Sequence, residues 1–329
     1  MFLYLILAVL LISISMNAYQ FYTIRKLSTQ NDMEKDYNLD AGVSNYQLLS
    51  PKIAWLGVNE FVEEQQHLTI SYKDMKSSVN FVLQNTQGHY AFYFEDLTTG
   101  AWIGIHEKEE FASLSLLKVP TMIATLKEVE SGNVSLDTEL ELNAEDIDMN
   151  SGTLGTKGAG YKITVRQLLV ELIKHSDNTA LLTLNRRVVS EQTFVEARLA
   201  MGMPPPTVEA KITAKDYANM LRGLYFSNYL RRPFSELALT LMLDTDFNSQ
   251  IPAGVPKDVK VAHKVGFYTI GGYYHDCGII YAPNKPYILC VLSKDSTQQE
   301  ADKVISQLSK IVYVYVTTHP SNINSTNNP

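Results

Sequence analysis

The chain has 329 residues, which is enough for one large domain or two small ones. Hydrophobic residues make up 45% of the sequence, so a sizeable core can form. The formal net charge is −7 and no dense basic stripe is present, which argues against nucleic acid as a partner. The histidines and cysteines show no metal-binding spacing of the HxxxH or CxxC kind, so we expect neither a metal nor a cofactor.

Residues 1–24 carry no charged side chain. As a helix they would reach roughly 36 Å, enough to cross a hydrocarbon core of about 30 Å. A secretory signal peptide is the alternative, but a basic N-terminal region is missing and the cleavage-site pattern is poor. We therefore predict a single membrane anchor. Arg25 and Lys26 follow it and, by the positive-inside rule, would hold the C-terminal side in the cytoplasm.

Residues 25–70 are polar, without strong periodicity, and are predicted to form a stalk. The segments that follow show helical or strand periodicity. They are an amphipathic helix within 70–85, a β-hairpin over 89–107 that turns at 98–100, a helix over 113–132, helical spacing over 164–189 with Thr164 as its N-cap, three strands within 257–295, and a helix over 297–316. A polar tail, 319–329, ends the chain.

The order of these elements predicts the fold class. Strands near both ends of the domain, with helices between them, are typical of an α+β fold in which the terminal elements share one sheet. Turns between the last three strands are expected near Gly271-Gly272 and Pro283-Asn284. Gly132 suits the left-handed end of the helix over 113–132, and Pro120 lies close enough to its start for the first turn to absorb it.

Three short motifs fall within the predicted domain. They are Ser115-Leu116-Leu117-Lys118, Ser176-Asp177-Asn178 and Lys264-Val265-Gly266. Each is weak alone, because a surface lysine, a loop tripeptide or an ordinary strand end would explain it. Together, and in this order, they are far more specific.

The first motif places a lysine in an otherwise apolar segment, "FASLSLLKVPTM". Positions i and i+3 lie on one face of a helix, so Lys118 can reach the hydroxyl of Ser115. A serine hydroxyl is a poor nucleophile until a neighbouring base takes its proton. Burial lowers the pKa of an ammonium group, and the neutral amine can then act as that base.

With the sequence around them, the three motifs resemble those of the class A β-lactamases, within the penicillin-recognising serine hydrolases. The similarity covers roughly residues 70–318 and includes the phrases "EDLTTGAWIGIHEKEEFASLSLLKVPTM", "TVRQLLVELIKHSDNTALLTL" and "IPAGVPKDVKVAHKVG". It implies a hydrolase domain over 71–318 with an antiparallel sheet, flanking helices and an all-helical lobe. The site would lie in the cleft between the two lobes.

The resemblance implies catalytic roles for Ser115, Lys118 and Ser176. Ser115 would be the nucleophile and would carry the acyl group of the acyl-enzyme. Lys118 would be its base, and Ser176 would pass a proton to the leaving nitrogen as the amide or lactam opens.

Substrate would be bound by Asn178, Lys264, Gly266 and Phe267. Asn178 would hydrogen-bond the side-chain amide of the substrate, and Lys264 would supply positive charge near its carboxylate. The backbone N–H groups of Phe267 and Ser115 would form the oxyanion hole.

The sequence departs from the family pattern in three places. The long loop that carries the deacylating glutamate is shorter by about fifteen residues, and Glu209 in "MPPPTVEA", its only carboxylate, is expected to be a surface residue. Val265 replaces the threonine or serine of K-T-G, and Asp276 stands where many relatives place an arginine. His263 and His275 are candidates to compensate, although a histidine on a strand is more often structural or exposed.

Cys277 and Cys290 flank the turn "APNK". Counting outward from this turn places them opposite each other, close enough for a disulfide. Two reduced core cysteines are an equal alternative. A disulfide would require an oxidising compartment, which favours a domain outside the membrane despite the basic residues after the anchor.

We therefore expect a serine acyl-enzyme hydrolase that opens β-lactam rings or D-Ala-D-Ala-type amide bonds, with slow deacylation. A penicillin-binding D-alanyl-D-alanine carboxypeptidase or transpeptidase is the alternative within this class. A catalytically weak module that binds cell-wall stem peptides is the alternative outside it. We place the catalytic domain outside the cytoplasm, held to the membrane through residues 1–24, and the sequence leaves the oligomeric state open.

Overall fold

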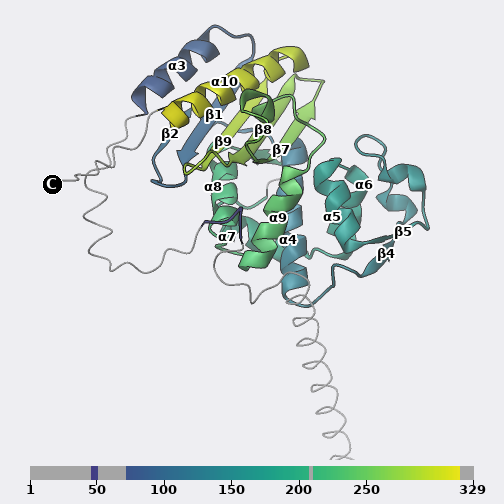
Figure 1. The fold of residues 1–329 in the computed structure, drawn as a ribbon. Coiled ribbons are helices and arrows are strands. Elements are labelled where there is room, and N and C mark those ends of the chain that lie inside the picture. The colour runs from purple at the N-terminus through teal and green to yellow at the C-terminus, as the bar shows by residue number, and fades with distance from the viewer. Residues whose placement is uncertain (1–45, 51–71, 207–209, 319–329) are drawn as a thin grey trace, which may run out of the picture.

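The computed structural model describes residues 46–50, 72–206 and 210–318. They form an α+β fold with a five-stranded sheet in the order β2-β1-β9-β8-β7, in which all neighbours are antiparallel (Figure 1). The strands are β1 (His89–Asp96), β2 (Trp102–Ile105), β7 (Val261–Tyr268), β8 (Tyr273–Ile280) and β9 (Tyr287–Lys294). The expected fold class and the pairing of the two ends of the domain in one sheet are confirmed.

The sheet separates two apolar cores. Along β1, Phe92 and Phe94 join one core and Tyr93 joins the other, because side chains alternate along a strand. Helices α3 (Lys73–Gln84) and α10 (Gln298–Thr318) lie side by side over the first face, as the top of Figure 1 shows. The remaining α-helices pack on the second core and form the other lobe.

This second lobe is built around α4 (Lys118–Glu130), in which nearly every side chain is buried. The other elements of the lobe, in chain order, are β3 (Phe111–Ala112), η1 (Leu114–Leu117), β4 (Glu139–Glu141), η2 (Ala144–Asp146), η3 (Leu154–Lys157), β5 (Lys162–Thr164), α5 (Val165–Lys174), α6 (Asn178–Arg187), α7 (Glu191–Ala200), β6 (Lys211–Ile212), α8 (Ala214–Tyr225) and α9 (Arg232–Leu243). The short helix η4 (Ile251–Gly254) packs instead on α10, in the first core. The resemblance implied an all-helical lobe. This expectation is wrong, because β4 pairs with β5 within the lobe.

The periodic segments fold as the sequence predicted. The hairpin, the three C-terminal strands and the helices within 70–85 and 297–316 are all present. The hydroxyl of Thr164 caps α5 by accepting a hydrogen bond from the N–H of Gln167. The helical spacing over 164–189 covers two helices, because the chain breaks at 175–177 and Asp177 begins α6 as its N-cap.

The predicted anchor, most of the stalk and the polar tail at 319–329 lie outside the described residues. Among the residues that are described, no helix has both the length and the apolar character needed to span a bilayer. Residues 46–50, which the sequence assigned to the stalk, instead pack on the domain. Leu48 and Leu49 are buried in its core, and the N–H of Leu48 donates to the carboxylate of Glu236.

Candidate active site

Ser115 lies in the 3₁₀ turn η1, directly before α4. The preceding residue, Leu114, has a φ of 49°, in the left-handed region that residues other than glycine rarely occupy. Strand β7 packs closely on this turn, since a Cβ at Gly266 would lie 3.3 Å from Cβ of Leu114 and 3.4 Å from N of Leu116. The glycine therefore allows the strand to approach the serine.

Lys118 is the first residue of α4, is 1% exposed, and reaches back to the same turn. Its Nζ lies 3.0 Å from Oγ of Ser115 and 2.6 Å from the carbonyl oxygen of Ser176. Burial lowers the pKa of Lys118 to about 8, although two nearby carboxylates offset part of the effect. Some of the amine is therefore neutral near neutral pH, within reach of the serine hydroxyl.

Ser176 lies between α5 and α6 and is fully buried, with a φ of 54°. Its Oγ accepts hydrogen bonds from Nζ of Lys264 at 2.9 Å and from Nζ of Lys118 at 3.2 Å. Burial and then the positive charge of Lys118 hold the pKa of Lys264 well below its ordinary value. The hydroxyl of Ser176 is thus flanked by two desolvated amines.

Asn178 completes the hydrogen-bonded cluster. Its Oδ1 accepts from Nζ of Lys118 at 2.7 Å, and its Nδ2 donates to Oδ1 of Asp148 at 3.3 Å. Burial would raise the pKa of Asp148, but hydrogen bonds from Asn150 and Asn178 outweigh it and hold that pKa below its ordinary value. The side chain of Asn178 therefore lies between an amine and an anionic carboxylate.

Asp177 anchors the S-D-N segment to the loop before it. One carboxylate oxygen accepts from the N–H of Ala180 at 2.9 Å, and the other accepts from the N–H of Leu154 at 2.8 Å. A Cβ at Gly152 would lie only 2.0 Å from Oδ2 of Asp177, and its φ of 81° also favours glycine. Sequence reasoning missed Gly152 and Asp148, although the glycine-rich run "SGTLGTKGAG" carried a signal for this loop.

The structure thus brings five of the predicted site residues into one bonded cluster, namely Ser115, Lys118, Ser176, Asn178 and Lys264. Gly266 packs on the η1 turn beside them. Phe267, the next residue of β7, is 47% exposed, and its ring lies 5.9 Å from the ring of Phe247. The backbone of this strand therefore faces the serine, while its aromatic side chain lies at the surface.

The two histidines proposed to compensate for the missing arginine are not available to substrate. His263 is buried, with Nδ1 2.8 Å from Oδ1 of Asp276 and Nε2 2.9 Å from Oγ1 of Thr245. Asp276 is itself fully buried and accepts from the N–H of Ile251. The aspartate at the arginine position therefore forms a structural pair with His263.

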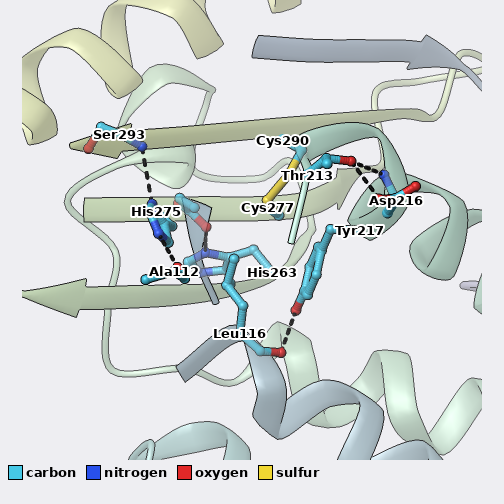
Figure 2. The surroundings of a disulfide bond; sticks show 11 residues. Ala112, Leu116, Thr213, Asp216, Tyr217, His263, His275, Cys277, Cys290 and Ser293 are labelled. Carbon is cyan, nitrogen blue, oxygen red and sulfur yellow. Dashed lines mark hydrogen bonds and ion pairs between the residues drawn. A yellow bond between two sulfur atoms is a disulfide. The ribbon is translucent and has the colours of Figure 1, made fainter. Parts of the chain in front are cut away.

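His275 is bonded through both ring nitrogens. Its Nε2 lies 2.8 Å from the carbonyl oxygen of Ala112, and the N–H of Ser293 donates to its Nδ1 at 3.1 Å (Figure 2). Burial lowers the pKa of His275 to about 4, so the ring is neutral and Nε2 carries the proton. Neither candidate histidine takes the place of the arginine, and both have the structural role that the sequence favoured.

Cys277 on β8 and Cys290 on β9 form a disulfide. The two residues are directly paired across the strands, as counting from the turn predicted, and both are fully buried. Figure 2 shows Tyr217 of α8 beside the disulfide, and its hydroxyl donates to the carbonyl oxygen of Leu116. The disulfide therefore lies behind the η1 turn that holds Ser115, and the alternative of two reduced cysteines is not observed.

The connection between α7 and α8 is short, as the sequence indicated. Its last part is fixed to the strand before the nucleophile: β6 pairs with β3, and the N–H of Ser113 donates to the carbonyl oxygen of Ala210 at 2.9 Å. Residues 201–206 and 210 contain no carboxylate, and Glu209 lies outside the described residues. The described part of this connection offers no base for a deacylating water.

An antiparallel sheet beside a helical lobe, with a hydrogen-bonded Ser–Lys–Ser–Asn–Lys cluster, defines the class of penicillin-recognising serine hydrolases. The model of a family described as "Beta-lactamase enzyme family" matches residues 74–316. The chain therefore belongs to the β-lactamase enzyme family, and it is a serine hydrolase that works through an acyl-enzyme.

Individual relatives are distant. β-Lactamase VEB-1 of Pseudomonas aeruginosa is 24% identical over 244 residues, which cover 64% of this chain and 80% of the relative. The structure of PBP-A superposes with a TM-score of 0.69 at 22% identity, covering 75% of this chain and 97% of PBP-A. A PBP-A variant solved as an acyl-enzyme complex with penicillin G has a TM-score of 0.66, again at 22% identity with 75% and 97% coverage.

Proposed function

We propose that this hydrolase opens β-lactam rings or D-Ala-D-Ala-type amide bonds through an ester on Ser115, and that the ester is hydrolysed slowly. The observation that carries the proposal is the buried amine of Lys118, 3.0 Å from the Ser115 hydroxyl. A buried amine with a lowered pKa next to a hydroxyl is the arrangement that activates a serine nucleophile.

In the acylation step, neutral Lys118 takes the proton of Ser115 while Oγ forms a bond to the substrate carbonyl carbon. The N–H groups of Ser115 and Phe267 stabilise the charge that develops on the carbonyl oxygen. The C–N bond of the lactam then breaks. The proton passes from Lys118 to the leaving nitrogen through the hydroxyl of Ser176, which is bonded to Lys118 and Lys264.

The substrate-binding residues act around this step. Asn178 donates to the side-chain amide of the acyl group when Nδ2 exchanges its bond to Asp148 for one to substrate. Lys264 supplies positive charge near the substrate carboxylate, beside Ser176. Gly266 leaves space for the strand and the substrate to meet at the nucleophile turn.

Slow deacylation is supported by the short connection between α7 and α8. Hydrolysis of the ester needs a base that activates water, and residues 201–206 and 210 provide no carboxylate. The PBP-A variant shows that a protein of this fold can be isolated as a penicillin acyl-enzyme. A D-alanyl-D-alanine carboxypeptidase or transpeptidase would use the same residues and is the second candidate.

Intact-protein mass spectrometry after exposure to penicillin G tests the proposal. Ring opening is an addition, so the adduct should weigh one intact penicillin, persist long after free drug is removed, and be absent from Ser115→Ala. No adduct with any β-lactam or depsipeptide would reject the acyl-enzyme. An adduct that forms and decays many times per second would retain the nucleophile but reject slow deacylation.

The same experiment separates the hydrolase from a catalytically weak binding module. A binding module would hold a stem peptide equally well in the wild type and in Ser115→Ala, with no covalent product in either. Release of D-alanine from a D-Ala-D-Ala peptide by the wild type alone would favour the peptidase candidate.

We also propose that residues 1–24 anchor the protein and that the catalytic domain lies outside the cytoplasm. The disulfide between Cys277 and Cys290 supports this location, because such bonds persist in oxidising compartments. Arg25 and Lys26 favour the opposite orientation. Protease added to intact cells should degrade the domain, whereas a domain that is cut only after lysis would overturn the proposed location.

A further inference from the structure

A second cluster of ionisable side chains lies away from the active site, where β1 begins and β2 ends. It consists of His89 on β1 together with His106 and Glu109 in the segment between β2 and β3. The potential ligand atoms of the three residues all lie within 4.8 Å of one another. Nε2 of His89 is 2.6 Å from Oε2 of Glu109, so these two already face each other.

Outer hydrogen bonds orient two of the three side chains. Nδ1 of His106 lies 3.0 Å from the carbonyl oxygen of Tyr90, which can only accept, so Nδ1 carries the proton and Nε2 keeps its lone pair. Nζ of Lys294 donates to Oε1 of Glu109 at 2.8 Å and leaves Oε2 on the histidine side. Ligands of protein-bound metals are commonly held by such outer partners.

Packing also holds the cluster in place. The rings of His89 and His106 stack with centroids 5.0 Å apart and an interplanar angle of 25°. The ring of Phe111, on β3, lies 6.0 Å from that of His89. The N–H of Glu109 donates to the carbonyl oxygen of His106 and closes the turn between them.

We infer that His89, His106 and Glu109 form a binding site for Zn²⁺. Two imidazole nitrogens and one carboxylate oxygen are ligands that zinc accepts at about 2.0–2.2 Å, with a fourth tetrahedral position left to water. His89 and Glu109 are each about one-third exposed, so an ion and its water can enter from solvent. The ion replaces the direct hydrogen bond between His89 and Glu109.

The site escapes a motif search because its ligands are not regularly spaced, with sixteen residues between His89 and His106. Hairpin formation between β1 and β2 brings the two imidazoles together. The ion would tie the start of β1 to the segment that leads through β3 to Ser115. It lies outside the bonded cluster around Ser115, so we assign it a stabilising role.

Titration of tag-free, chelator-treated full chain with Zn²⁺ tests the inference. We expect one equivalent to bind and to raise the thermal midpoint. His106→Asn tolerates the left-handed backbone at this position and Glu109→Gln preserves side-chain shape, so both should fold but bind Zn²⁺ roughly tenfold or more weakly. Circular dichroism without zinc confirms that the variants are folded.

His175 provides the matched control. Its Nδ1 lies 2.6 Å from Oδ2 of Asp246, a comparable histidine–carboxylate pair that belongs to no three-ligand cluster among the described residues. His175→Ala should therefore leave Zn²⁺ affinity and the midpoint shift unchanged. The site is refuted if the wild type binds less than one equivalent, or if both His106→Asn and Glu109→Gln retain wild-type affinity.

Discussion

At the scale of single residues, the proposed reactivity of Ser115 depends on the protonation of Lys118. Only the neutral amine can accept a proton, and burial lowers the pKa of this residue to about 8. Below that pH the neutral fraction falls roughly tenfold per pH unit, as for any single ionisation with one proton. We expect the second-order rate constant for acylation by penicillin G to rise with pH up to about 8 and then to level off.

The pH profile has a direct control in Lys118→Arg. An arginine keeps the positive charge but does not lose its proton in a protein, so acylation should be abolished across the whole range. A profile that is flat over the same range in the wild type would show that Lys118 is not the base.

Val265 departs from the K-T-G pattern at a position where the family's hydroxyl is expected to contact the substrate carboxylate. It is 5% exposed and lies between the two motif residues Lys264 and Gly266, but it offers no hydroxyl. A hydrogen bond to a charged group contributes roughly 1.5–3 kcal/mol, which corresponds to about a ten- to hundredfold change in affinity. Val265→Thr should therefore raise the acylation rate constant for carboxylate-bearing penicillins by about tenfold or more.

Val265→Ile is the matched control, because it keeps the branched shape without adding a hydroxyl. Its acylation rate should stay near that of the wild type. Equal rates for Val265→Thr and the wild type would mean that the substrate carboxylate does not approach this position.

At the scale of elements, His275 links the main sheet to the short strand before the nucleophile, since it joins β8 to β3 through Ala112. Its pKa is about 4 in the fold and would be near 6.5 in the unfolded chain. Because the folded value is the lower one, the stabilisation is complete above pH 6.5 and is lost as the pH falls toward 4. The loss amounts to about 3 kcal/mol over this interval.

Urea unfolding of the wild type and His275→Gln at several pH values measures this contribution. The wild type should lose more stability between pH 6.5 and 4 than the variant does, since carboxylates affect both proteins alike. If the stabilities of the wild type and His275→Gln changed in parallel with pH, His275 would have the same pKa in the folded and unfolded chains.

Local sequence patterns predicted the elements and part of the site. The i, i+3 spacing of Ser115 and Lys118 predicted their contact, and counting from the "APNK" turn predicted the pairing of Cys277 with Cys290. The break at 175–177 was not predicted, because apolar periodicity continues on both sides of it. The zinc ligands were missed for a related reason: strand pairing, not sequence spacing, brings them together.

At the scale of the whole molecule, the domain includes a segment from well before its first helix. Residues 46–50 lie against the second core, with Leu48 and Leu49 only 3% and 4% exposed. The sequence did not predict this contact, because five residues are too few to show periodicity and their partners lie far along the chain. The boundary placed at residue 71 therefore omits part of the core.

Shortening the buried side chain of Leu49 should destabilise the entire domain. We expect Leu49→Ala to lower the free energy of unfolding by about 2–5 kcal/mol, the usual cost of truncating a buried leucine. Leu199→Ala is the control, since that leucine is 51% exposed and should contribute little. Urea midpoints that are equal for the two variants would show that the segment does not dock in solution.

The protonation of the two amines that flank the hydroxyl of Ser176 should change when an anionic ligand binds. Burial, and then the charge of Lys118, make the protonated form of Lys264 less favourable before a ligand arrives. An arriving carboxylate favours its protonated form, so the complex should absorb a proton from the solution. Titration calorimetry of Ser115→Ala in buffers with different ionisation enthalpies would report that uptake as a heat that changes from buffer to buffer, even though no covalent bond forms.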